Sequence, residues 1–141
     1  MIKALRFLAV LLLLFNGIGA LYGGGSLMSD PTGQKIQLPL SYLQYSPFTD
    51  YFIPGIVLFI ANGVLSMIVT GLVLIRHRHY AQFVVLQGAI LCGWIVIQVL
   101  MVRNIYYLHY IMGFIGIALI GSGIILTLKD SPTKKRRSNL R

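Results

Sequence analysis

Four long apolar stretches divide the chain, and each is long enough to cross a membrane as a helix. They run over residues 5–22, 52–75, 82–102 and 106–128. About 20 consecutive apolar residues span the hydrocarbon core of a bilayer, and a helix satisfies its own backbone hydrogen bonds there. The pattern therefore predicts an all-α integral membrane protein, whose residues 1–128 form a bundle of four transmembrane helices.

The polar segments between these stretches differ in length. The connections "RHRHYA" and "RNIYYLH" are short, so we expect antiparallel hairpins there. The connection over residues 23–51 is long. Its "SDPTG" favours a turn, and the tyrosines of "LPLSYLQY" suit a membrane interface. We therefore expect a structured first outer loop, and a separate basic cytoplasmic tail over residues 129–141.

Composition supports a membrane location. The chain is 57% hydrophobic and 11% charged, whereas soluble domains carry about 25% charged residues, so it cannot cover itself with polar surface. The single Cys92 excludes an internal disulfide and a CxxC redox pair. We interpret Cys92 as a small packing residue.

The basic residues predict the orientation of the helices. Lys35 and Arg103 lie on one side. The other side carries Lys3, Arg6, Arg76, Arg78, Lys129, Lys134, Lys135, Arg136, Arg137 and Arg141. The positive-inside rule then places both termini in the cytoplasm. A signal peptide ending at "GIGA" is an alternative for the first segment, but its apolar run is long.

The net charge of +9 does not indicate nucleic acid as a partner. The basic tail has no interleaved aromatic residues, so we interpret it as a solvated segment that contacts anionic lipid.

Polar residues inside the spans are the candidates for function, because such residues are costly in a membrane. Asn62, Ser66 and Thr70 share one helical face, and Gln87, Leu91, Trp94 and Gln98 form a second stripe at helical spacing. By depth, several polar groups converge in the outer half. The predicted ligand-binding residues are Asn16, Asn62, Trp94, Gln98, Arg103, His109 and Asp50. Hydrogen bonding between helices is the alternative role for them.

The stretch "SPFTDYFIPG" (46–55) predicts a hinge for the outer loop. Ser46 suits an N-cap and Pro47 the first helical position, while Pro54 interrupts hydrogen bonding in a continuing helix. We therefore expect a short helical turn that bends into the second span, so that Ser46, Pro47, Asp50 and Pro54 hold the loop as a lid. We also expect Asp50 to pair with Arg103.

Glycines predict close helix packing. They are Gly63 and Gly71 in the second span, and Gly113, Gly116, Gly121 and Gly123 in the fourth.

Several classes of function find no support in the residues. No acidic residue lies within a span, which argues against proton-coupled antiport of the small multidrug type. His77 and His79 have no nearby Cys, Asp or Glu, so we predict no metal site. There is no phosphate-binding glycine motif, no cofactor motif and no catalytic set. We therefore expect a protein that is not an enzyme.

Three motifs resemble those of an uncharacterised family of small four-span bacterial membrane proteins. They are "LMSDPTG" (27–33), "SPFTDYFIPG" (46–55) and "GWIVIQ" (93–98), which resemble its LM-x-DP-x-G turn, SPF-x-DY-x-x-PG segment and GW-x-x-x-Q helix. The resemblance covers residues 20–128 and implies a multi-pass protein of the bacterial cytoplasmic (inner) membrane. The layout is also similar to that of DoxX-like four-helix proteins.

The leading hypothesis is a non-enzymatic membrane protein with an outward-facing pocket for a small apolar or amphipathic molecule, such as a lipid or a quinone-like compound. An accessory or assembly subunit of a larger membrane complex is the first alternative. A small channel or transporter, formed as a homo-oligomer, is the second. The sequence does not name the ligand.

Overall fold

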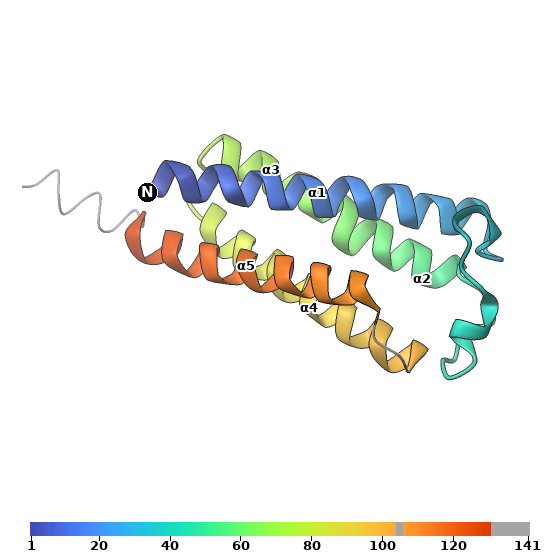
Figure 1. Cartoon of the computed structure of the whole chain (residues 1–141). Helices are drawn as coiled ribbons and strands as arrows, with labels where there is room; N and C mark the ends of the chain where they lie inside the picture. Colours follow the sequence, from blue (N-terminus) through green and yellow to red (C-terminus); the bar gives the residue numbers. More distant parts are fainter. Residues whose placement is uncertain (104–105, 131–141) are drawn as a thin grey trace, which may run out of the picture.

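The computed structural model describes residues 1–103 and 106–130, and helices make up most of them (Figure 1). No strand occurs in these ranges. The elements are α1 (Ile2–Ser29), the 3₁₀ turns η1 (Gln34–Ile36) and η2 (Leu40–Leu43), α2 (Phe52–Val57), the π-helix η3 (Leu58–Val64), α3 (Leu65–Leu74), α4 (Tyr80–Val102) and α5 (Tyr107–Lys129). The predicted tail over residues 131–141 lies outside the described residues.

Four helices are long and apolar enough to cross a membrane, as predicted: α1, the continuous helix over Phe52–Leu74, α4 and α5. The main difference is that α1 continues to Ser29 instead of ending near Tyr22. Its glycines favour close packing there, because a Cβ added at Gly24 would lie 2.7 Å from the Gly55 carbonyl oxygen of α2. This packing outweighs the low helix propensity of glycine.

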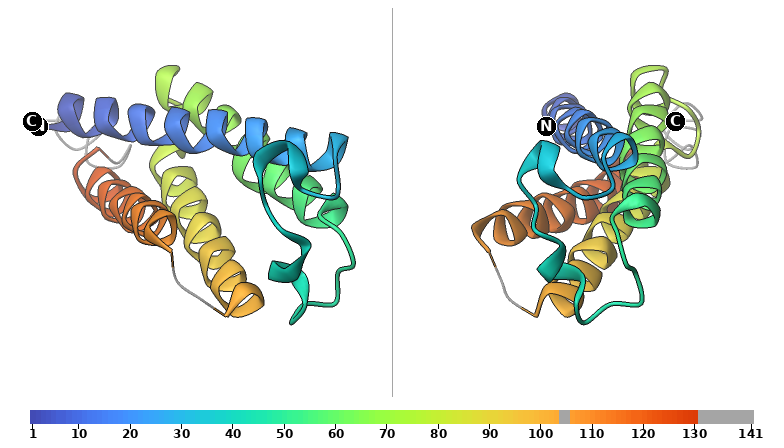
Figure 2. Two further views of the ribbon diagram at one scale, coloured as in Figure 1. Left: turned by 45° about the vertical axis from the view of Figure 1, so that its right-hand side comes forward. Right: turned by 90° about the vertical axis from the view of Figure 1, so that its right-hand side faces the viewer.

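The four helices form a bundle in which each contacts its two neighbours. Helix α1 packs against the second span and α5, and α4 packs against the second span and α5 (Figure 2). Two pairs are especially close. Gly24 and Gly55 join α1 to the second span, and Gly88 and Gly116 join α4 to α5, where an added Cβ at Gly88 would meet the Gly116 carbonyl oxygen at 2.7 Å.

The glycine predictions are right in part. Gly63, Gly116 and Gly123 each lie against a neighbouring helix. Added Cβ atoms at Gly71, Gly113 and Gly121 would meet no neighbouring atom within 4 Å, so these three do not serve close packing within the chain. A glycine count cannot show which face of a helix is covered.

The second span is one helix with a π-helical middle. At its end the Leu65 N–H donates to the Ile60 carbonyl oxygen, five residues back, before the helix returns to α geometry. Pro54 lies in the first turn, where N–H groups have no intrahelical acceptor in any case. The helical turn expected from Ser46 is wrong: the helix begins at Phe52, and Pro54 does not interrupt it.

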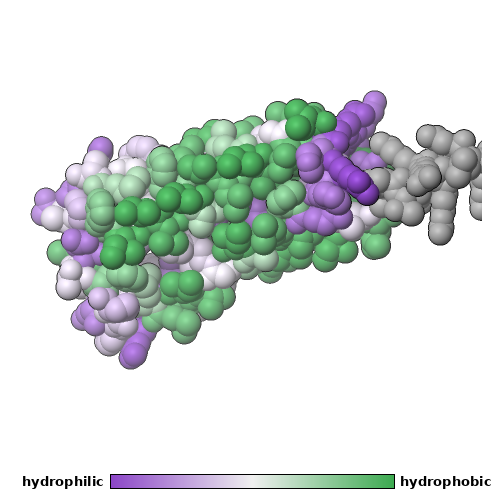
Figure 3. Space-filling view, turned by 180° about the vertical axis from the view of Figure 1, so that it is seen from behind, coloured by the Kyte–Doolittle hydropathy of each residue, from purple (hydrophilic) through white to green (hydrophobic). Residues whose placement is uncertain are grey.

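The two helix pairs diverge towards the end that carries residues 30–51, here called the loop end (Figure 2). The main core lies towards the opposite end, and it includes Leu13, Val69, Val84, Leu119 and Leu126. A second, small cluster of Leu27, Leu43 and Tyr51 anchors the loop. Apolar surface covers the middle of the molecule and polar residues gather towards its two ends (Figure 3).

Candidate functional site

A cavity of about 780 Å³ lies at the loop end, where the helix pairs diverge. Helices α1, α4 and α5 supply most of its walls. The loop closes it from above, through Ile36, Leu38, Tyr42, Leu43 and Tyr51. Most of the lining side chains are apolar or aromatic, and none is Lys, Arg, Asp or Glu. The arrangement suits an apolar molecule with few polar atoms.

Four of the seven predicted ligand-binding residues line this cavity. Asn16 comes from α1, Trp94 and Gln98 from α4, and His109 from α5. The cavity therefore brings together residues that are far apart in the sequence. The other three, Asn62, Arg103 and Asp50, do not line it.

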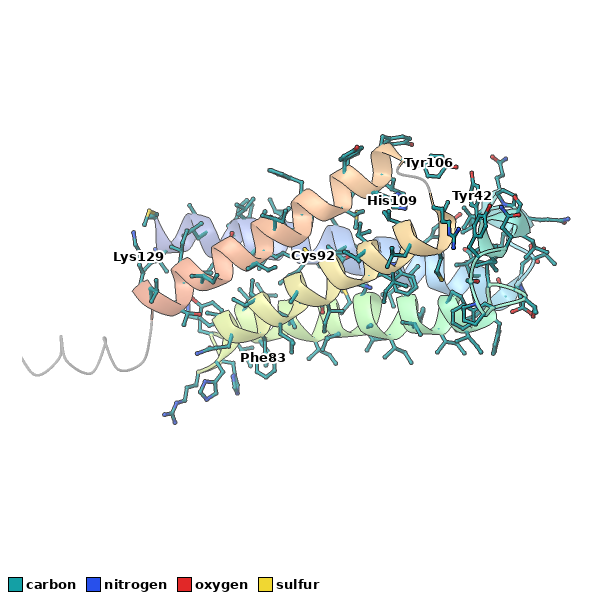
Figure 4. The ribbon with its side chains drawn as sticks, turned by 90° about the horizontal axis from the view of Figure 1, so that it is seen from below. Tyr42, Phe83, Cys92, Tyr106, His109 and Lys129 are labelled. Atoms are coloured by element: carbon teal, nitrogen blue, oxygen red, sulfur yellow. The ribbon has the colours of Figure 1, made fainter. Side chains whose placement is uncertain are left out.

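His109 is held at the start of α5 by a capping contact. Its Nδ1 accepts a hydrogen bond of 3.1 Å from the Tyr106 backbone N–H. An accepting Nδ1 carries no proton, so the neutral ring has its proton on Nε2. The Tyr106 ring lies 5.9 Å from the His109 ring and 5.7 Å from the Tyr42 ring of η2 (Figure 4). Tyr42 and Tyr106 thus connect the loop to α5.

Trp94 and Gln98 are one helical turn apart on α4, so they project from the same face. Trp94 is buried and Gln98 is half-buried. Within residues 1–103 and 106–130, no protein group hydrogen-bonds the Gln98 amide. The Trp94 indole N–H likewise has no acceptor within these ranges, so the described residues engage neither group.

A buried polar cluster lies next to the cavity, farther from the loop end, and shares Asn16 with it. The Asn16 Nδ2 donates to Ser66 Oγ at 2.9 Å and to the Asn62 carbonyl oxygen at 3.5 Å. Gln87 Nε2 of α4 donates to Asn62 Oδ1 at 3.4 Å. Asn62, Ser66 and Gln87 have no exposed surface. For Asn62 and Ser66, interhelical hydrogen bonding is thus the role that the geometry supports.

Gln87 also contacts the π-helix. Its Nε2 lies 3.2 Å from the Ala61 carbonyl oxygen. In an α-helix that oxygen would accept from the Leu65 N–H, which here bonds to Ile60 instead. Gln87 therefore supplies a donor where the wide turn removes one, and it joins the second span to α4. Asn62 Nδ2 and Gln87 Oε1 have no hydrogen-bond partner in the part of the chain that the structure describes.

Arg103 and Asp50 do not form the expected ion pair, although both are described. The Arg103 guanidinium carbon lies 4.1 Å from the centre of the Tyr45 ring, a cation–π contact. Asp50 Oδ1 accepts a hydrogen bond of 3.0 Å from the Phe52 N–H at the start of α2. The prediction of a pair is wrong because each charge has a nearer partner.

The loop is folded by its own hydrogen bonds. The Tyr51 hydroxyl donates to the Pro39 carbonyl oxygen at 2.7 Å, and burial raises the pKa of Tyr51 to about 12. Hydrogen bonds from the Thr32 side chain and from the Lys35 backbone lower the pKa of Asp30. Gly33 has φ +79° and no room for a Cβ, which would lie 2.4 Å from the Leu38 carbonyl oxygen.

Three of the four predicted hinge residues, Ser46, Pro47 and Asp50, lie in the non-helical part of the loop. Ser46 Oγ donates to the Leu43 carbonyl oxygen at 2.8 Å and accepts from the Phe48 N–H at 3.2 Å. Pro47 is exposed. Pro54 does line the cavity. These contacts fix the path of the loop into α2, and the hinge role stays a prediction.

Among the described residues, the opposite end of the bundle carries a smaller cavity of about 280 Å³, lined by Gln82, Val85, Ile124, Thr127 and Leu128. No group of three His, Cys, Asp or Glu side chains could hold a metal ion in the part of the chain that the structure describes. The Tyr80 hydroxyl donates to Asp130 Oδ2 at 2.6 Å, which joins the ends of α4 and α5. Cys92 packs closely against Gly116, because a Cβ added at Gly116 would lie 2.6 Å from the Cys92 Sγ. Such a contact is typical of a packing residue.

Comparison with protein-family models, curated proteins and solved structures finds no match for this chain. The resemblance to a small four-span family stays a prediction.

Sequence reasoning missed three contributors to the cavity. The sequence predicts Tyr42 only at the membrane interface, Tyr106 only in a short connection, and Gly19 only within the first span. Gly19 lines the cavity, and an added Cβ there would meet no neighbouring atom within 4 Å. The four-residue spacing from Phe15 to Gly19 and Gly23 was a signal for this face of α1.

Proposed function

We propose that this chain is a non-enzymatic integral membrane protein that holds a small apolar or amphipathic molecule, a lipid or a quinone-like compound, in the loop-end cavity. The cavity itself is the observation that carries the proposal. Its volume of about 780 Å³ falls within the range of about 300–1,000 Å³ common for small-molecule sites. Its apolar lining with a few convergent polar groups is also typical of such sites.

The proposed orientation places the loop end outside and both termini in the cytoplasm. The described cations at the opposite end include Lys3, Arg6, Arg76, Arg78 and Lys129, and the positive-inside rule puts such an end in the cytoplasm. We propose the bacterial cytoplasmic membrane as the location, on the resemblance of the three motifs. The cavity would then face outwards, beneath a lid formed by residues 30–51.

Native mass spectrometry of the protein extracted in mild detergent tests the proposal. We expect the wild-type protein to carry a small molecule, and we expect Gly19→Leu to lose it because the new side chain fills the cavity. Gly113→Leu is the matched control. Gly113 is also a helical glycine with free space at its Cβ position, but it does not line the cavity.

Two outcomes would contradict the proposal. One is a wild-type protein that carries no small molecule when extracted from its native membrane. The other is equal retention by Gly19→Leu and Gly113→Leu, since a ligand indifferent to Gly19 does not occupy this cavity. A stable complex with a second protein and no small molecule would favour the accessory-subunit hypothesis instead.

A further inference from the structure

We infer that the cavity selects an uncharged amphipathic molecule, with one hydrogen-bonding head group, that reaches the site sideways from the lipid between α1 and α5. This inference rests on the proposed function and names the class of ligand and its route. It follows from three features of the cavity: where it is open, which charges it lacks, and which donors and acceptors it presents.

The opening lies on the side of the bundle. Several residues that line the cavity are also more than half exposed, namely Phe15 and Ile18 of α1 (58% each) and Leu108 of α5 (54%). Helix α5 diverges from α1 towards the loop end (Figure 2). An apolar opening at this depth faces hydrocarbon, whereas the loop covers the end that faces water. A molecule dissolved in the lipid can therefore enter without crossing the loop.

The lining argues for an uncharged ligand. Among the described lining residues there is no Lys, Arg, Asp or Glu, and His109 is the one histidine. A charged head group would lose its hydration there and gain no ionic partner, which is strongly unfavourable. Two charged side chains at the loop end are already engaged, since Arg103 lies over Tyr45 and Asp50 accepts from the Phe52 N–H.

The polar lining groups are arranged to bind a neutral head. The His109 Nδ1 is occupied by Tyr106, so the ring offers its Nε2–H, and Trp94 offers its indole N–H. Gln98 offers both a donor and an acceptor. Asn16 is 2% exposed, and no described donor reaches its Oδ1. A hydroxyl or carbonyl oxygen matches this set, because it accepts from the N–H groups without needing a counter-charge.

The ligand would then lie with its head among Trp94, Gln98 and His109, and with its chain along the opening beside Phe15 and Ile18. Gly19 lies at this opening without a side chain, so it leaves room for the chain to pass.

Trp94 provides a direct test, because it is the only tryptophan of the protein and it lines the cavity. The probes are three compounds with the same brominated alkyl chain and different heads: a primary alcohol, a sulfate and a trimethylammonium. Bromine quenches tryptophan fluorescence on close contact, so saturable quenching in detergent or in neutral lipid vesicles reports occupancy. A probe that only partitions into the detergent or lipid gives quenching that rises with concentration and does not saturate.

We expect saturable quenching by the alcohol, with apparent affinity at least about tenfold higher than for either charged probe. Gly19→Leu should abolish the saturable part and Gly113→Leu should keep it. If a charged probe binds as tightly as the alcohol, the head-group inference is wrong while the cavity proposal stands. If Gly19→Leu leaves quenching by the alcohol unchanged, the alcohol does not occupy this cavity, and both the site and the side route are wrong. If none of the probes quenches saturably, the proposed function fails as well.

Discussion

Arg103 shows how a cation near the membrane edge is stabilised without an acidic partner. It is exposed, ends α4 in a left-handed conformation (φ 56°), and lies over the Tyr45 ring of the loop. A cation–π contact at such a site contributes about 0.5–1 kcal/mol. Asp50 has a different role, because its carboxylate caps the start of α2.

This difference gives a prediction for two variants. Arg103→Gln should destabilise the loop by about 0.5–1 kcal/mol and raise its protease sensitivity, since the contact with Tyr45 is lost. Asp50→Asn should have a smaller effect, because an asparagine Oδ1 can still accept from the Phe52 N–H. Equal effects of the two variants, with strong coupling between them in a double-mutant cycle, would instead indicate an ion pair.

Tyr51 gives a prediction that depends on pH. Burial raises its folded-state pKa from 10.0 to about 12, so the folded protein keeps this proton at pH values where the unfolded chain has lost it. The contribution to stability is thus complete below about pH 10 and is lost as the pH rises to about 12. Tyr51→Phe should make the alkaline fall in loop stability shallower, as measured by protease resistance across this pH range.

At neutral pH the same variant removes the hydrogen bond to the Pro39 carbonyl oxygen. We expect a loss of about 1 kcal/mol and faster cleavage of the loop. If Tyr51→Phe changes neither the cleavage rate at neutral pH nor the loss of loop stability at alkaline pH, the described burial of Tyr51 is contradicted.

At the scale of the elements, glycine contacts hold two rigid helix pairs, and the cavity lies where these pairs separate. The contact of Gly88 with the Gly116 carbonyl oxygen involves backbone on both sides, so it cannot relax by rotating a side chain. The absence of side chains at these positions therefore lets α4 and α5 pack backbone against backbone, whereas the side between α1 and α5 is open at the loop end.

Gly88→Ala tests this packing. The added Cβ would lie 2.7 Å from the Gly116 carbonyl oxygen, and overpacking of this kind destabilises by about 1–3 kcal/mol. Gly113→Ala is the control, which we expect to be neutral or stabilising by up to about 1 kcal/mol through helix propensity. Unfolding in mixed micelles gives both values, and a Gly88→Ala variant as stable as the control would contradict the close approach.

The buried polar cluster belongs to the same scale. Asn16 of α1 and Ser66 of α3 should show a coupling free energy of about 0.6 kcal/mol in a double-mutant cycle with alanine, the average for interhelical hydrogen bonds in membranes. The same unfolding assay measures it. A coupling indistinguishable from zero would mean that the 2.9 Å contact does not stabilise the bundle.

Local sequence patterns predicted the helices well, and they predicted the contacts between helices less well. Apolar runs gave four helices. Depth predicted that Asn16, Gln98, Arg103 and His109 converge, and all of them except Arg103 line the cavity. The end of α1, the π-helix and the contacts of Arg103 depend on neighbouring segments, so no local pattern carried them. Asn62 and Trp94 both lie on polar stripes, yet only Trp94 lines the cavity. The sequence could not predict this difference, since a polar stripe does not show which neighbouring helix it faces.

At the scale of the whole molecule, the orientation of the bundle decides what the cavity faces. In a Cys92→Ser background, a cysteine at Gln37 in the loop should react with a membrane-impermeant maleimide added to intact cells. A cysteine at His79 should react only after permeabilisation, because the proposed orientation places the basic end in the cytoplasm. The opposite labelling pattern would contradict the proposed orientation.

The central claim is that a small molecule occupies the space between the two helix pairs at the loop end. A density map of the protein purified from its native membrane into lipid nanodiscs tests it most directly. We expect non-protein density in the cavity, in contact with Trp94, Gln98 and His109 and reaching the side between α1 and α5. A map in which α1 and α5 close together, so that these side chains pack on each other with no space between them, would contradict the claim.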